Sequence, residues 1–485
     1  MRTLKPLLLL LCYLANFTAA AQKVGLLDKP VVEKIDKLIN IYLDYGEFNG
    51  NILVAKNNKI IYNRAYGQAN MEWNIPNEQK TKFRIASLTK QFTAALILKL
   101  VQEKKLKLKD KISDHLPYYR RDIGKKVTIH HLLTHSSGIP NYTTLSKFHE
   151  GISKSYIPVK VMITEFCSED LEFEPGEKFV FNNSGYFILG AIIEAVTEKS
   201  FATVLHEKII EPLHLNDTGY DNQNEILPKR ASGYQRIGLQ YFKAPYVDMS
   251  ISYAAGAMYS TVDDLYKWNQ ALDNPKFLPK KFKKLMFTPQ VLNYGYGWVI
   301  EQRKKNLQKG STTVAFHSGV LQGFNAYIMR MEQEGHTIIL LNNTGNVPIE
   351  SIGDNIRAIL YDLPFDLPKQ GLIRPLLNII QESNVQTAIK YYKRLKKEKR
   401  EAYIFNEGQL NTLGYELLRL NQIKEAIAIL KLNVEEYPDA FNTYDSLAEA
   451  YLANDDKKSA ILNYKQSLLL NPDNFNAKIM LEKLD

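Results

Sequence analysis

The chain has few cysteines and, beyond its first residues, no long apolar run. Its 485 residues include only Cys12 and Cys167. We expect Cys12 to leave with a signal peptide, so Cys167 has no intramolecular partner and a disulfide-stapled fold is excluded. Cys167 is interpreted as a small buried apolar side chain and not as a catalytic thiol. No later run is long enough to cross a bilayer, so we expect no transmembrane span in the mature chain.

The chain also lacks the pattern of a nucleic-acid-binding protein, although its formal net charge is +10. The most basic run, residues 393–400, has no interleaved aromatic residues and lies in a helical pattern. It is therefore interpreted as a solvated helix face, and we expect no nucleic-acid partner.

The first 21 residues have the pattern of a secretory signal peptide. Arg2 and Lys5 give a positive start, residues 7–14 an apolar core, and Ala19-Ala20-Ala21 a small-residue cleavage site. We expect cleavage near Ala21 and export to the periplasm or outer surface of a bacterium. Lipid modification at Cys12 is disfavoured because bulky side chains flank it, whereas an uncleaved anchor stays open as an alternative.

Ser87 and Lys90 form an S-x-x-K motif at the start of the apolar stretch 91–101. Residues three apart share one face of a helix, so the lysine amine can accept the serine proton. A lysine at the start of a buried helix is unexpected, because burying its charge is costly, and this favours a functional role for Lys90. Most chance matches to this motif are solvated helix faces, so its weight depends on the segments that follow.

Strand patterns occur near both ends of the first 360 or so residues, with loops and short helices between them. The predicted strands are 50–55, 59–62, 313–317, 325–329 and 336–341. This arrangement predicts an α+β fold with one antiparallel sheet, closed by strands from both ends and flanked by helices.

A second, helical region follows a boundary rich in proline. Beyond it, landmarks recur at an offset of 34 residues: Leu413-Gly414 with Leu447-Ala448, Ala426 with Ala460, and Pro438-Asp439 with Pro472-Asp473. That offset is the tetratricopeptide period. The alternative is a generic pair of helical hairpins. Because two or so repeats rarely stand alone, we expect this region to pack on the first domain.

Residues from about Gly46 to Leu360 resemble the serine β-lactamase and penicillin-binding-protein superfamily, most of all its branch of class C β-lactamases, D-aminopeptidases and serine esterases. The similar segments occur in the superfamily's order: 83–93, 129–140, 174–186, 255–265 and 317–319. The resemblance implies a β-lactamase-like fold for this part of the chain.

The resemblance also implies a mechanism. Ser87 would attack a carbonyl and form an acyl-enzyme, Lys90 would assist proton transfer, and Asn183 would hydrogen-bond the substrate or Lys90. No cofactor and no metal are implied.

The third motif of the superfamily, K-T-G or H-x-G, is matched by His317-Ser318-Gly319. The resemblance implies substrate contacts for His317 and Gly319, and an oxyanion hole made by the backbone N–H groups of Ser87 and Val320. A largely neutral histidine holds a β-lactam carboxylate less well than lysine does, which favours esters or peptides as substrates.

Phe181 departs from the superfamily, whose second motif is Tyr-x-Asn with the tyrosine acting beside the lysine as general base. Phenylalanine keeps a ring that can contact substrate and loses the hydroxyl, and general acid–base help is worth roughly 10²–10⁴ in rate. The enzyme would then be slow, or Lys90 would act alone with a pKa depressed by burial. The rival interpretations are an inactive binding or sensor protein and a protein whose repeats carry the main function.

Three other patterns have competing interpretations. His131 and His135 are spaced like metal ligands, but a structural role is favoured because no carboxylate lies between them. Asp263-Asp264 follows Ser260-Thr261 and is interpreted as a helix start. The segment Gly295–Trp298 fits either a pocket wall or a tight strand pair.

The sequence therefore predicts an exported serine hydrolase acting on an ester, amide or β-lactam bond of a small or peptide-like substrate. The predicted domains are a signal peptide (1–21), a β-lactamase-like hydrolase domain (22–365), a linker (366–380) and all-α tetratricopeptide-like repeats (381–485). The repeats are a candidate surface for a protein partner.

Overall fold

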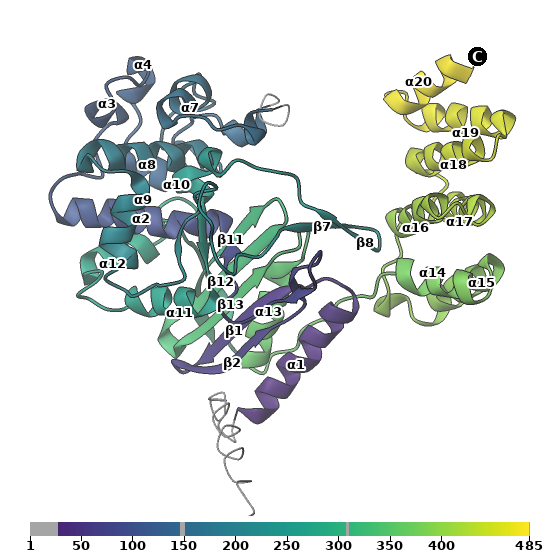
Figure 1. Cartoon of the computed structure of the whole chain (residues 1–485), viewed down its shortest axis with the longest axis horizontal. Helices are drawn as coiled ribbons and strands as arrows, with labels where there is room; N and C mark the ends of the chain where they lie inside the picture. Colours follow the sequence, from purple (N-terminus) through teal and green to yellow (C-terminus); the bar gives the residue numbers. More distant parts are fainter. Residues whose placement is uncertain (1–27, 146–150, 307–309, 485) are drawn as a thin grey trace, which may run out of the picture.

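The computed structural model describes residues 28–145, 151–306 and 310–484. The predicted signal peptide and its cleavage site lie outside these residues. A sheet covered by helices forms the first part of the molecule, and an arm of stacked helices forms the second (Figure 1). Within the described part of the chain, no helix is long and apolar enough to span a bilayer.

The central sheet has six strands in the order β10-β11-β12-β13-β1-β2, and every pair is antiparallel. Its strands are β1 (Gly50–Lys56), β2 (Lys59–Ala65), β10 (Val299–Lys304), β11 (Ser311–Leu321), β12 (Phe324–Met331) and β13 (His336–Asn342). Strand β1 pairs with β13, with Gly50 opposite Asn342, so both ends of the domain close one sheet. The predicted α+β fold is confirmed, and β10 is a strand that the sequence did not indicate.

The turn between β1 and β2 follows from two asparagines. Asn57 and Asn58 have φ angles of 52° and 59°. Asparagine tolerates this left-handed region better than most residues, and two consecutive positive φ values suit a tight hairpin turn.

Helices cover both faces of the sheet. Ile52 and Val54 point toward the core shared with α1 (Lys29–Asp44) and α13 (Ile349–Leu360). Leu53, one residue along, points to the opposite core. That core holds the helices α2 (Thr89–Gln102), α8 (Asn183–Thr197) and α11 (Val262–Ala271). Because helices cover both faces, the inner strands β1, β12 and β13 are buried along nearly their whole length.

The middle of the chain forms short elements around the sheet. Its remaining helices are α3 (Ile112–His115), α4 (Arg121–Gly124), α5 (Ile129–Leu133), α7 (Val159–Phe166), α9 (Phe201–Leu205), α10 (Tyr253–Gly256) and α12 (Lys280–Phe287). Its strands are β3 (Gln68–Asn70), β4 (Ile75–Pro76), β5 (Phe83–Arg84), β6 (Gly219–Tyr220), β7 (Tyr234–Ile237), β8 (Gln240–Lys243) and β9 (Met258–Ser260).

The arm is entirely helical, as predicted. Its helices are α14 (Ile373–Glu382), α15 (Val385–Glu398), α16 (Glu407–Arg419), α17 (Ile423–Glu436), α18 (Phe441–Ala453), α19 (Lys457–Leu470) and α20 (Phe475–Leu484). A Cβ at Gly414 would lie 2.6 Å from Leu430, so this glycine lets α16 and α17 approach closely. The tetratricopeptide assignment and the domain boundaries stay predictions.

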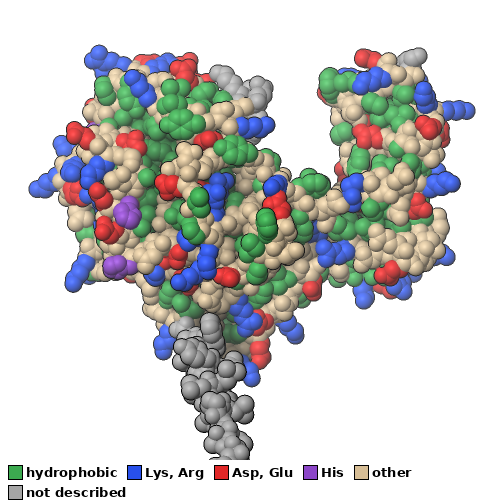
Figure 2. All heavy atoms as spheres, viewed as in Figure 1, with side chains coloured by type: hydrophobic (Ala, Val, Ile, Leu, Met, Phe, Trp, Pro, Cys, Tyr) green, Lys and Arg blue, Asp and Glu red, His purple; other side chains and the backbone are tan. Residues whose placement is uncertain are grey.

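The arm touches the first domain near its base, and the space above that contact is open (Figure 2). The hairpin β7–β8 reaches from the sheet domain toward α16 (Figure 1). At the hairpin tip the backbone N–H of Leu239 donates to Glu416 Oε1 at 3.4 Å, and the Leu239 side chain packs on the core of the arm. The arm therefore packs on the first domain.

Candidate active site

Ser87 lies in a short 3₁₀ helix, η1 (Ala86–Leu88), immediately before α2. The preceding residue, Ala86, has a φ of 46°, a region that residues with a Cβ seldom adopt. Such strained backbone is frequent at active sites, where the surrounding structure holds it in place. The bend presents Ser87 to a cavity of about 230 Å³. This cavity is lined by Ala86, Ser87, Tyr142, Thr143, Asn183, Val247, Ile251, Ser252, Ala255, Gly256, Val320, Leu321 and Gln322.

Lys90 is fully buried one turn after Ser87. Its Nζ lies 2.9 Å from Ser87 Oγ, 2.8 Å from Asn183 Oδ1 and 2.8 Å from the carbonyl oxygen of Ala255. Burial lowers the pKa of Lys90 to about 7. A neutral amine has two N–H donors and one lone pair. Because the two carbonyl oxygens can only accept, they take both N–H groups and leave the lone pair for the Ser87 hydroxyl.

Asn183 is held in the orientation that this arrangement needs. It opens α8, and its side-chain N–H₂ donates to Thr143 Oγ1 at 3.2 Å, which leaves Oδ1 for Lys90. Its backbone N–H donates to Asn141 Oδ1 at 3.2 Å. The structure thus brings Ser87, Lys90 and Asn183 together from separate parts of the sequence.

Gly319 lets strand β11 lie directly against the nucleophile. A Cβ at this position would be 2.3 Å from the carbonyl oxygen of Ile85 and 3.1 Å from the backbone nitrogen of Ser87. The next residue, Val320, lines the same cavity as Ser87. The two residues predicted to supply oxyanion-hole donors therefore face one pocket.

Phe181 lies beside Lys90, where the superfamily has its tyrosine. Lys90 Nζ is 5.0 Å from the centroid of the Phe181 ring, and the phenylalanine is 39% exposed. The ring thus occupies the edge of the site without a hydroxyl to share the proton of Lys90.

His317 is buried and neutral. Its Nδ1 is 2.6 Å from the carbonyl oxygen of Ser318, which can only accept, so this nitrogen carries the proton. Its Nε2, 3.0 Å from the Tyr294 hydroxyl, then accepts from that O–H. Burial, with a smaller effect of Lys90, lowers the pKa of His317 to about 3. His317 therefore offers no positive charge to a substrate at neutral pH.

Three residues lie beside the site in a way that the sequence did not indicate: Tyr294, Ala255 and His135, for which only a structural role was predicted. His135 Nδ1 accepts from the backbone N–H of Asn182 at 3.1 Å, and its ring lies 4.5 Å from that of Phe181, centroid to centroid. Burial, followed by Lys90 and His317, holds its pKa well below the usual range. Ala255 acts through its backbone oxygen, which no side-chain pattern reveals.

The alternative metal site at His131 and His135 is not supported. His131 Nδ1 accepts from the backbone N–H of Thr128 at 3.3 Å, whereas His135 faces the catalytic centre. Among residues 28–145, 151–306 and 310–484, no group of three or more histidine, cysteine or acidic side chains could hold a metal ion. The structural interpretation is the better one.

The other competing patterns also have structural explanations. Thr261 caps α11 and accepts from the backbone N–H of Asp264 at 3.3 Å, which confirms the predicted helix start. A Cβ at Gly297 would lie 2.9 Å from the backbone of Gln91, so the segment Gly295–Trp298 packs tightly behind α2. Cys167 is buried, as predicted, and burial raises the pKa of its thiol to about 12.

Comparison with known proteins shows that the first domain matches a known protein family and curated relatives. The family model described as Beta-lactamase matches residues 35–361, which leaves the helices from α14 onward outside the match. Protein flp of Staphylococcus aureus (strain N315) is 28% identical over 342 residues, covering 67% of this chain and 66% of the relative. Penicillin-binding protein 4* of Bacillus subtilis (strain 168) is 29% identical over 348 residues, covering 67% of this chain and 75% of the relative.

A solved structure gives the same result. The penicillin binding protein from Bacillus halodurans superposes with a TM-score of 0.59 at 27% identity, covering 66% of this chain and 98% of that one. The fold resemblance inferred from the motifs is thereby confirmed for the first domain.

Proposed function

The chain belongs to the Beta-lactamase family, and from this premise we propose that it is an exported serine hydrolase that cleaves an ester or amide bond through an acyl-enzyme on Ser87. The observation that carries this proposal is the 2.9 Å contact between Ser87 Oγ and the buried amine of Lys90. Export rests on the predicted signal peptide alone, and a mature protein starting at Gln22 in the periplasm or culture medium would support it.

Acylation begins when the Ser87 hydroxyl gives its proton to the lone pair of Lys90 and Oγ bonds to the substrate carbonyl carbon. The resulting oxyanion is stabilised by the backbone N–H groups of Ser87 and Val320, each typically worth ~10²–10³ in rate. Asn183 and Ala255 hold the ammonium form of Lys90 in place. Lys90 then returns the proton to the leaving group as the bond to that group breaks.

Deacylation reverses these steps with water as the nucleophile. Water gives a proton to Lys90, its oxygen bonds to the acyl carbon, and the bond to Ser87 Oγ breaks as Oγ recovers the proton. Phe181 has no hydroxyl to help this transfer, so Lys90 works alone and deacylation is the slow step.

The substrate has no carboxylate beside the scissile bond. Among the described residues that line the Ser87 cavity there is no lysine or arginine, and His317 is neutral. Val247, Ile251 and Leu321 give the cavity an apolar wall. An ester or amide with an apolar acyl group fits this lining better than a β-lactam, although the name of the Bacillus subtilis relative supports acylation by penicillin as a side reaction.

Steady-state hydrolysis of p-nitrophenyl esters with acyl chains of increasing length tests this function. The wild type should release p-nitrophenol with a preference for medium apolar chains, and Ser87→Ala should lose that activity. A chromogenic β-lactam should be turned over far more slowly. Equal activity of the wild type and Ser87→Ala would contradict the proposal.

A second candidate function is a sensor that is acylated and stays acylated, which the missing hydroxyl at Phe181 favours. The two functions differ in the lifetime of the acyl-enzyme. Release of a single equivalent of product per Ser87, without further turnover, would favour the sensor.

The arm is a candidate docking surface for a protein partner. Deleting residues 371–485, with circular dichroism to confirm that the remaining domain folds, separates the roles of the two parts. Unchanged ester hydrolysis would leave the arm a docking or stabilising role, and this is the result we expect.

A further inference from the structure

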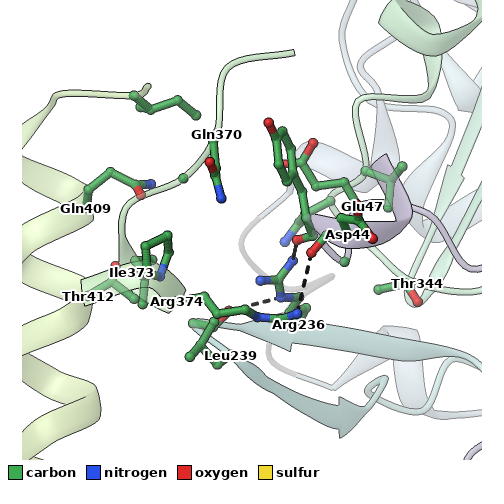
Figure 3. A pocket seen from close by; sticks show the side chains of 18 of the residues that line it. Asp44, Glu47, Arg236, Leu239, Thr344, Gln370, Ile373, Arg374, Gln409 and Thr412 are labelled. Atoms are coloured by element: carbon green, nitrogen blue, oxygen red, sulfur yellow. Dashed lines mark hydrogen bonds between the residues drawn. The ribbon is translucent and has the colours of Figure 1, made fainter. Parts of the chain in front are cut away.

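A second cavity lies where the first domain meets the arm. Its volume is about 270 Å³, and it shares no lining residue with the Ser87 cavity. The end of α1 and the tip of the β7–β8 hairpin form one side, and α14 and α16 form the other (Figure 3). We call it the junction cavity.

Two arginines, one from each domain, reach into the junction cavity. Arg236 comes from β7 and Arg374 from α14 (Figure 3). Arg236 Nε donates to the carbonyl oxygen of Gly238 at 3.0 Å and Nη1 donates to that of Tyr45. Arg374 Nη1 donates to the carbonyl oxygen of Asp44 at 3.4 Å.

In the described part of the chain, these arginines form no ion pair. Within the described residues, neither guanidinium lies within 4.0 Å of a carboxylate oxygen. Burial lowers the pKa of Arg236, and the like charge of Arg374 lowers it further, against the opposing effects of Tyr241 and Glu47. Within the described residues, the hydrogen bonds of both guanidinium groups go only to main-chain carbonyls, so each group keeps N–H donors free for an anion.

Two acidic residues, Asp44 and Glu47, also line the cavity, but within the described residues neither forms an ion pair there. Burial raises the pKa of Glu47, and the charge of Arg236 offsets this only in part. The two acidic side chains balance the formal charge of the two guanidinium groups, so an anion would be held by the N–H donors that no carboxylate occupies and not by a net positive charge.

Neutral donors complete the lining. Gln409 Oε1 accepts from the backbone N–H of Leu372 at 2.7 Å, so its side-chain N–H₂ is free to donate. The side-chain amide of Gln370 has no hydrogen bond to any described residue and lies at the same cavity (Figure 3). Leu239 and Ile373 add an apolar surface.

We propose that the junction cavity is a second binding site, for the carboxylate end of a short peptide. The carboxylate oxygens would bridge Arg236 and Arg374, a pairing for which guanidinium geometry is well suited. The amides of Gln370 and Gln409 would bind the peptide backbone, and one small side chain would contact Leu239. Because the two arginines belong to different domains, the bound peptide joins the arm to the hydrolase domain.

The competing interpretation is purely structural. Both arginines donate to carbonyls at the end of α1, and such contacts stabilise a helix C-terminus without any ligand. The two interpretations differ in whether a free carboxylate binds and in which side chains that binding depends on.

Isothermal titration calorimetry on the full-length Ser87→Ala protein tests the proposal without turnover. The probes are N-acetyl-alanyl-alanine and its C-terminal amide, which differ only in the charged group. The acid should bind and the amide should bind at least 10-fold more weakly. Equal binding of acid and amide, or no binding of the acid at millimolar concentration, would overturn the proposal.

Three variants assign the binding to this cavity. Arg374→Gln should weaken binding of the acid at least 10-fold, whereas Lys390→Gln, an exposed change elsewhere on the arm, should leave it unchanged. Glu47→Gln should tighten it, because the repelling carboxylate is gone while the side-chain volume is kept. An unchanged affinity in Arg374→Gln, or a weaker one in Glu47→Gln, would contradict the charge argument.

A phosphate competition distinguishes a peptide site from a general anion site. Inorganic phosphate at the same concentration as the peptide should displace little of it, since phosphate cannot use the amides and the apolar surface. Complete displacement by phosphate would reject the peptide as the ligand.

Discussion

Lys90 is the single residue whose protonation decides how reactive Ser87 is. Its amine is fully buried and contacts two carbonyl oxygens and one hydroxyl. Desolvation disfavours the ammonium form, which is why the pKa falls so far below that of an exposed lysine. The reactive form is the neutral amine, since only that form has a lone pair for the serine proton.

The first prediction concerns the pH dependence of acylation. Because burial lowers the pKa of Lys90 to about 7, the amine is protonated and inactive below that pH and neutral above it. The rate of acylation by an activated ester should therefore rise through about pH 7 and then level off. Single-turnover kinetics measure it. A midpoint near the ordinary lysine pKa of about 10.4 would show that burial does not tune this amine.

The second prediction concerns Phe181. Phe181→Tyr supplies a hydroxyl to a ring that already lies beside Lys90, so turnover should rise by about 10–100-fold, up to the lower end of the range of general acid–base effects. Steady-state kcat for an ester is the readout. Phe181→Leu is the matched control and should give no increase. A decrease in kcat for Phe181→Tyr would mean that the hydroxyl cannot reach the reacting atoms.

At the scale of single residues, the sequence motifs predicted which residues lie together at the site, and the catalytic roles of these residues stay predictions. Ser87, Lys90 and Asn183 lie within hydrogen-bond distance, as expected from their types and order. The place of His135 and Tyr294 beside the site was not predicted, because it depends on which aromatic side chains surround them after folding. Their neighbours are distant in sequence, and no local spacing encodes such contacts.

Among the elements, the contact between strand β11 and η1 shapes the site most directly. Gly319 is the point of contact, and a Cβ added at this position would lie closest to the backbone oxygen of Ile85. A backbone atom cannot move aside as a flexible side chain does, so the spacing of β11 and η1 depends on this glycine.

The third prediction follows from that contact. Gly319→Ala should displace β11 from Ser87, misplace the N–H of Val320 and lower kcat by ~10²–10³, the usual value of an oxyanion-hole donor. Ester hydrolysis and thermal unfolding are measured together. Gly408→Ala, an exposed position in α16 where a Cβ would meet nothing closer than 3.4 Å, is the control. Full activity in Gly319→Ala would reject the proposed geometry.

The elements were predictable where they form continuous apolar runs. Strands β1, β12 and β13 are buried on both faces and were predicted correctly from their apolar segments, which in β1 and β13 are runs of isoleucine, leucine and valine. Strand β10 was missed because it lies at the edge of the sheet and has alternating polar residues. Strands β5, β6 and β9 have two or three residues each, and their pairing is set by tertiary contacts alone.

For the whole molecule, the hairpin β7–β8 is the structural link between the two parts. The tip of the hairpin packs on the arm through Leu239. The base of the hairpin lies close to the catalytic cavity, because a Cβ added at Gly233 would lie 3.2 Å from the backbone oxygen of Gln322, which lines the Ser87 cavity. The hairpin therefore runs from the rim of the catalytic cavity to the arm.

The fourth prediction concerns this link. Leu239→Asp places a charge against the apolar core of the arm, so the arm should separate more readily and limited proteolysis near residues 366–372, which precede α14, should be faster. Ile237→Asp changes an exposed residue of the same hairpin and should behave like the wild type. Equal proteolysis rates for the two variants would mean that the hairpin tip does not hold the arm.

The most direct test of the account is intact-mass spectrometry of the mature protein after exposure to an activated ester and to a β-lactam, with Ser87→Ala alongside. We predict an adduct of one acyl group that needs Ser87, forms with the ester and clears as product is released. Labelling of Ser87→Ala to the same extent, or the absence of any adduct and of any turnover with the ester, would contradict Ser87 as the nucleophile.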